Sequence, residues 1–161
     1  MVLKNNEILK HYRSVYYYNM TESVIPFWLK NSPDKAHGGT FSCLDADGSV
    51  YDTKKYTWLT GRSIWMFSRL YNELENKPEF LEIAATGIDF LEMYCIDPKG
   101  RYYFSLTRDG KPWFYQRKPY GAVFAMLAYQ EYFKATGKEK YWKEAVQLFW
   151  KIREWIEDPT K

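Results

Sequence analysis

The chain has 161 residues, of which 46% are hydrophobic and 27% charged, which is typical of a globular protein with a sizeable core. Its 23 lysines and arginines are interspersed with 20 acidic residues, and the net charge is +3. Since no motif for reading DNA or RNA is present, we expect no nucleic-acid partner. No stretch is apolar enough for a signal peptide or a membrane span. Cys43 and Cys95 lack metal-ligand spacing. These features predict a cytoplasmic protein with reduced thiols, no metal and no membrane contact.

Aromatic residues make up 20% of the chain: 15 Tyr, 10 Phe and 7 Trp. Aromatic side chains bury large areas in cores. Their faces also stack on the C–H faces of pyranose sugars. The composition therefore agrees with a large core and with a sugar-binding cleft, although core packing is the more frequent role for any single ring.

Hydrophobic periodicity and turn signals predict five helices and two β-hairpins. The expected helices cover residues 5–30, 58–74, 76–96, 118–137 and 138–159. The expected hairpins cover residues 36–52 and 98–116. Pro26 should kink or divide the first helix near its end. The hairpin turns are expected at Asp47-Gly48 and Asp109-Gly110.

The order of hairpin, inner helix and outer helix occurs twice, with a period near 61 residues. Gly48 and Gly110, for example, lie 62 residues apart. Such a period indicates an architecture of stacked helix pairs. About three pairs are present without a capping repeat, and we therefore expect residues 1–161 to be an incomplete part of a larger array.

The helix expected over residues 58–74 contains Arg62 in an unusually apolar context. At about 100° per residue, Trp58, Arg62, Trp65 and Arg69 share one face. The opposite side carries Leu59, Phe67, Leu70 and Leu74. Such a helix has little surface for water and is expected in the interior. Because a guanidinium stays charged at ordinary pH, Arg62 is either locked in a buried ion pair or faces a wet pocket where a ligand meets it.

An ordered series of short motifs runs along the chain from His37 to Pro159. It consists of His37–Gly39, Asp47-Gly48, Tyr51-Asp52, Lys55-Tyr56, Trp58-Leu59, Gly61-Arg62, Trp65-Met66, Leu106–Gly110, Gln116-Arg117, Thr136-Gly137 and Asp158-Pro159. With these motifs the chain resembles the amino-terminal part of the N-acylglucosamine 2-epimerase (renin-binding protein) family. The resemblance spans nearly the whole chain and is most specific over Tyr51–Tyr71.

The resemblance implies an all-α fold, an (α/α)6 toroid of helical hairpins with short β-hairpins in the loops. Residues 1–161 would be the amino-terminal portion of that single domain, with about its first three helix pairs. The implied reaction interconverts N-acetylglucosamine and N-acetylmannosamine by deprotonation and reprotonation at C2. A sister sugar epimerase or an aldose–ketose isomerase of the same fold is an alternative. A non-catalytic module that binds a sugar or a protein is an alternative of another class.

The resemblance also implies roles for particular residues. Arg62 matches the active-site arginine that stabilises the enediolate oxygen, and Trp58 and Tyr120 are expected to bind substrate with it. Lys55 fits the motif but has an alternative role, pairing with a helix end or a carboxylate. The family's acid–base histidines lie beyond this chain, so we expect it to be inactive alone. His11 is expected at the surface and His37 in a structural loop role.

Three further expectations come from the resemblance. No cofactor is required, although ATP is an allosteric effector in several members and no P-loop spacing is present here. The partner is a small-molecule amino sugar, and the full-length protein is expected to be a homodimer. Thr60 and Gly121-Ala122 depart from the family's usual residues, which leaves the exact sugar open.

Overall fold

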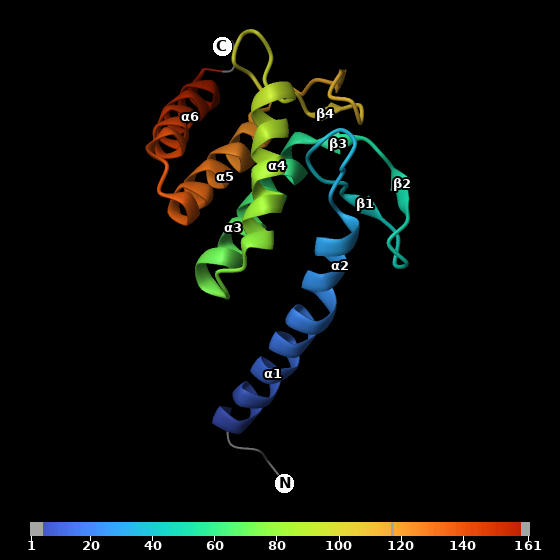
Figure 1. Ribbon diagram of the computed structural model, residues 1–161. Coiled ribbons are helices and arrows are strands. Elements are labelled where there is room, and N and C mark those ends of the chain that lie inside the picture. The colour runs from blue at the N-terminus through green and yellow to red at the C-terminus, as the bar shows by residue number, and fades with distance from the viewer. Residues whose placement is uncertain (1–4, 117, 159–161) are drawn as a thin grey trace.

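The computed structural model describes residues 5–116 and 118–158 (Figure 1). Its helices are α1 (Asn5–Asn19), the π-helical turn η1 (Met20–Val24), α2 (Ile25–Asn31), α3 (Thr57–Glu73), α4 (Pro78–Tyr94), α5 (Tyr120–Thr136) and α6 (Glu139–Glu157). Its strands are β1 (Cys43–Leu44), β2 (Val50–Asp52), β3 (Lys55–Tyr56), β4 (Ser105–Leu106) and β5 (Pro112–Phe114). The predicted order of helices and hairpins is confirmed.

The first helix runs on through Pro26 by way of a π-helical turn. Proline lacks an N–H group, and its ring clashes with the carbonyl group four residues earlier. The turn over Met20–Val24 widens the helix just before the proline, and the N–H of Ile25 donates to the carbonyl of Met20, five residues back. A wide turn of this kind absorbs the clash. The expected kink therefore takes the form of a local change of helix type.

The two inner helices, α3 and α5, lie side by side and run parallel. Thr57 lies beside Gly121 near their amino ends, and the Asn72 amide donates to the Glu131 carboxylate, 2.8 Å away, near their carboxyl ends. Gly61 permits the close approach, because a Cβ there would lie 2.7 Å from the carbonyl carbon of Phe124. The outer helices α4 and α6 pack on α3 and α5 respectively (Figure 1). This arrangement confirms the predicted repeat of inner and outer helices.

Both predicted hairpins form, and a third strand joins the second one. β1 pairs with β2, and β4 with β5, in antiparallel fashion. Gly48 and Gly110 have positive φ, and each donates its N–H to the carbonyl group three residues earlier. β3 pairs with β4. This unpredicted pairing attaches the start of α3 to the second hairpin.

The buried face of α3 agrees only in part with the expected one, since Phe67 and Ile64 are buried but the leucines are not. It consists of Thr57, Thr60, Gly61, Ile64, Phe67 and Ser68. Trp58 and Trp65 are half-buried, and Arg62 and Arg69 are exposed. The large apolar residues Leu59 and Leu70 are also only half-buried. Small residues occupy the α3–α5 interface because the two helices approach closely there. The face of α3 with Trp58, Arg62, Trp65 and Arg69 is not buried in this interface and remains accessible.

Within residues 5–116 and 118–158, no helix combines the length and apolar character needed to cross a membrane.

Candidate functional site

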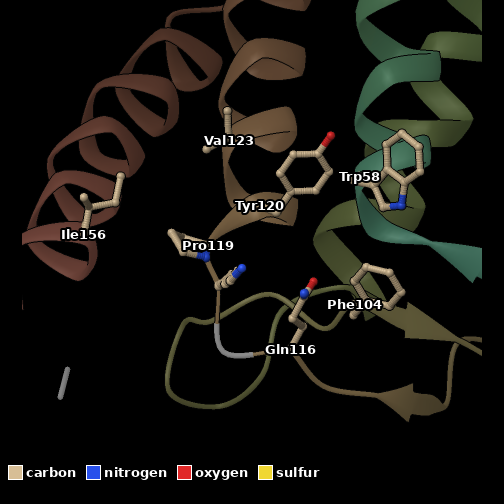
Figure 2. Close-up of a pocket in the computed structure, with 8 residues that line it drawn as sticks. Trp58, Phe104, Gln116, Pro119, Tyr120, Val123 and Ile156 are labelled. Atoms are coloured by element: carbon tan, nitrogen blue, oxygen red, sulfur yellow. The ribbon is translucent and has the colours of Figure 1, made fainter. Parts of the chain in front are cut away.

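A pocket of about 520 Å³ lies where the amino ends of α3 and α5 meet the segment after β5 (Figure 2). It is lined by Trp58, Phe104, Gln116, Lys118, Pro119, Tyr120, Val123 and Ile156. The rings of Trp58 and Tyr120 lie 5.8 Å apart between centroids. Apolar and aromatic walls with a few polar groups, at this volume, are typical of a small-molecule site.

The structure gathers the three expected site residues around the ring of Phe124. The Phe124 centroid lies 5.9 Å from that of Trp58, 5.1 Å from that of Tyr120 and 5.9 Å from the guanidinium carbon of Arg62. Trp58 and Tyr120 line the pocket, whereas Arg62 lies one helical turn further along α3 and outside its lining. Phe124 was missed in the sequence, although its position one turn after Tyr120 on the same helix face is a signal for it.

Arg62 is exposed, and among the described residues its side chain has an aromatic neighbour but no ion-pair partner. The buried ion pair that the sequence left open for Arg62 is therefore not formed within residues 5–116 and 118–158. The guanidinium keeps its hydrogen-bond donors available to a ligand.

A buried ionic cluster lies instead at Lys55, the first residue of β3. Its ammonium nitrogen is 3.0 Å from Oδ2 of Asp34, both side chains are fully buried, and the ammonium also donates to the carbonyl of Gly38. Arg108 binds both carboxylate oxygens of Asp34, at 2.9 Å each. The Phe90 ring lies 4.3 Å from the Lys55 nitrogen. Of the two roles open for Lys55, the structure shows pairing with a carboxylate.

The charges of this cluster are held by one another. Burial alone would raise the pKa of Asp34, but hydrogen bonds from Arg108 and Lys55 lower that pKa well below its ordinary value. Burial lowers the pKa of Lys55, and its contact with Asp34 opposes that shift. The cluster ties the loop at Asp34 to β3 and to the turn of the second hairpin. We therefore assign it a structural role.

The two histidines lie away from the pocket lining. His11 is exposed on α1, and His37 is exposed in the loop after α2, where its backbone N–H donates to Asp34 over 3.2 Å. Cys95 is buried, and burial raises the pKa of its thiol to about 12, so it is a poor nucleophile. No cluster of three or more His, Cys, Asp or Glu suited to a metal occurs among the described residues.

The sequence of residues 39–160 matches the model of a protein family described as N-acylglucosamine 2-epimerase (GlcNAc 2-epimerase). The chain belongs to the N-acylglucosamine 2-epimerase family. The resemblance seen in the sequence is thereby confirmed.

Individual relatives agree with this assignment. The N-acylglucosamine 2-epimerase of Rattus norvegicus is 43% identical over 144 residues, which cover 86% of this chain and 34% of that protein. A cellobiose 2-epimerase of Eubacterium cellulosolvens is 32% identical over 149 residues, 91% of this chain and 35% of that protein. The crystal structure of a sugar epimerase from a ruminal bacterium aligns with a TM-score of 0.78 at 29% identity, over 88% of this chain and 36% of that one.

The chain thus spans about a third of the length of these relatives. The structural neighbours include cellobiose 2-epimerases, which are (α/α)6 toroids. The expected fold class is confirmed, and the helices described here correspond to part of such a toroid.

Proposed function

We propose that this chain forms part of the substrate cleft of a sugar 2-epimerase that interconverts N-acetylglucosamine and N-acetylmannosamine. The observation that carries the proposal is an exposed arginine without an ion-pair partner among the described residues, beside an aromatic pocket. Sequence identity of 43% to an N-acylglucosamine 2-epimerase supports this sugar over others.

Epimerisation at C2 requires a proton to leave one face of the open-chain sugar and another to return on the opposite face. Removal of the proton next to the aldehyde leaves negative charge on an enediolate oxygen. In the proposal, Arg62 donates hydrogen bonds to that oxygen and stabilises the developing charge. Trp58 and Tyr120 hold the sugar by stacking.

The acid–base pair is assigned to residues outside this chain. Proton transfer at C2 needs groups with a pKa near neutral, which suits histidine. His11 and His37 are exposed residues away from the pocket lining. The chain corresponds to 34% of the length of the rat enzyme. The proposed enzyme is a cytoplasmic homodimer that requires no cofactor, with ATP as a candidate allosteric effector.

The test is to incubate the full-length polypeptide that carries this chain with N-acetylmannosamine in D2O and to follow N-acetylglucosamine by NMR. We expect N-acetylglucosamine labelled with deuterium at C2, and no turnover by residues 1–161 alone. Turnover of cellobiose but not of N-acetylmannosamine would assign the protein to the sister activity. The 32% identity to a cellobiose 2-epimerase is the reason to test this second sugar. Binding of sugars without any turnover by the full-length polypeptide would favour a non-catalytic module.

A further inference from the structure

One wall of the pocket has a polar group that the proposed reaction does not use. Gln116 is half-buried, and Figure 2 shows its amide directed into the space between Tyr120 and Phe104. Among the described residues, its side chain has no hydrogen-bond partner. A carboxamide directed into a largely apolar pocket is the kind of polar group that fixes the orientation of a ligand.

The surface next to this amide is apolar and rigid. Phe104 is held edge-on by Phe114, with centroids 5.6 Å apart and planes at 89°. It is also held by Tyr56, at 5.8 Å and 83°. These contacts come from the three-stranded sheet and fix the ring at the pocket wall. The wall therefore offers a fixed apolar surface beside a free amide.

We propose that Gln116 and Phe104 bind the N-acyl substituent of the sugar, so that the pocket selects 2-acylamino sugars over sugars with a 2-hydroxyl group. Gln116 hydrogen-bonds the amide of the acyl group, and the acyl methyl packs against Phe104. A 2-hydroxyl group has no methyl to cover the ring and is too short to reach both residues. This inference rests on the proposed function and assigns Gln116 as a specificity-determining residue.

The experiment uses the full-length enzyme with Gln116→Leu, which removes the amide and keeps a similar size. Gln147→Leu is the matched control, because Gln147 is exposed on α6 and does not line the pocket. We expect Gln116→Leu to lower kcat/KM for N-acetylmannosamine about 10- to 100-fold, mainly through KM, since one hydrogen bond and the placement of one methyl are lost. The inhibition constant of mannose should change less than about twofold, because mannose lacks the acyl group. The control should behave as wild type for both sugars.

Equal effects of Gln116→Leu on the two sugars, or no effect on either, would overturn the inference. The proposed function is tested separately, by turnover of N-acetylmannosamine by the wild-type enzyme. Saturation-transfer NMR on the unaltered enzyme gives a second readout that needs no variant. The acetyl methyl protons of N-acetylmannosamine should receive the strongest saturation, and a methyl signal weaker than those of the ring protons would also overturn it.

Discussion

Lys55 and Arg62 are cations seven residues apart in the same stretch of sequence, and their environments are opposite. Lys55 is fully buried against Asp34 and under the Phe90 ring. Arg62 is exposed over Phe124 and has no ion-pair partner among the described residues. A buried charge is tolerated only when it is paired, whereas an exposed one is free to meet a ligand. The comparison shows that one motif contains both a structural cation and a candidate substrate-binding one.

The largest effect should come from breaking the buried pair. Asp34→Ala leaves the Lys55 ammonium buried without its carboxylate and should lower the free energy of unfolding by about 3–5 kcal/mol. Urea unfolding of the full-length protein measures this. Asp89→Ala, at an exposed position of α4, is the control and should change it by less than about 0.5 kcal/mol. A loss below about 1 kcal/mol for Asp34→Ala would mean that the cluster is not structural.

For the exposed cation Arg62 we expect a loss of activity without a loss of stability. In the full-length enzyme, Arg62→Ala should reduce kcat about 10²–10³-fold, as loss of an oxyanion donor does. Its melting temperature should stay the same, because no described carboxylate loses a partner. Arg62→Lys keeps the charge but loses the planar fork of the guanidinium. Its kcat should therefore lie between those of the wild type and of Arg62→Ala. Normal turnover, or an unfolded variant, would refute the assigned role.

A third variant tests how the two inner helices hold the pocket. Gly61→Ala places a methyl group 2.7 Å from the backbone of Phe124, which cannot move without shifting α5. We expect a loss of about 1–3 kcal/mol in unfolding free energy from overpacking. Gly121→Ala is the matched control, because the nearest atoms to its Cβ would be side-chain atoms, of which the Thr57 methyl is the closest at 3.3 Å. Similar melting temperatures for the two variants would contradict the close approach at Gly61.

Acid should weaken the buried cluster. The folded-state pKa of Asp34 lies below the ordinary value of about 3.9. Its contribution to stability is therefore present above about pH 4 and is lost as the pH falls toward the folded-state pKa, by up to about 1.4 kcal/mol per pH unit. Urea unfolding at pH 7, 4 and 3 measures it. Asp34→Ala should show a shallower dependence, and parallel curves would contradict the assignment.

The smallest effect is expected at the rim of the cluster. The side chain of Arg108 is 41% exposed, and Asp34 keeps Lys55 when Arg108 is removed. Arg108→Ala should therefore cost less than about 1 kcal/mol. Thermal unfolding beside Asp34→Ala gives the comparison, and equal losses for the two variants would show that Arg108 is not a peripheral partner of Asp34.

Local signals in the sequence were sufficient for most of the fold. Apolar periodicity predicted the helices, and the glycines at the two hairpin turns do adopt positive φ. The pairing of β3 with β4 was not predictable in this way, because two-residue strands about fifty residues apart leave no periodic pattern. The buried face of α3 was predicted only in part: Phe67 is buried, but close packing at Gly61 favours small residues over large ones.

The candidate site was predictable only in part, and for a related reason. Trp58, Arg62 and Tyr120 were proposed from family motifs, and the structure places them around one ring. Asp34 was missed because its partners Lys55 and Arg108 are distant in sequence and meet only in the folded chain. The roles of the three site residues remain predictions until the variants are measured.

The parallel arrangement of α3 and α5 has an electrostatic consequence of its own. Each helix has a macrodipole with its positive end at the amino terminus, equivalent to about half an elementary charge. Because both helices begin beside the Trp58–Tyr120 pocket, these two partial charges add there instead of cancelling, as they would in an antiparallel pair. The backbone therefore biases the pocket toward anions before any side chain acts. In the proposed reaction, a sugar oxygen that gains negative charge near these helix ends would meet a field already oriented to receive it.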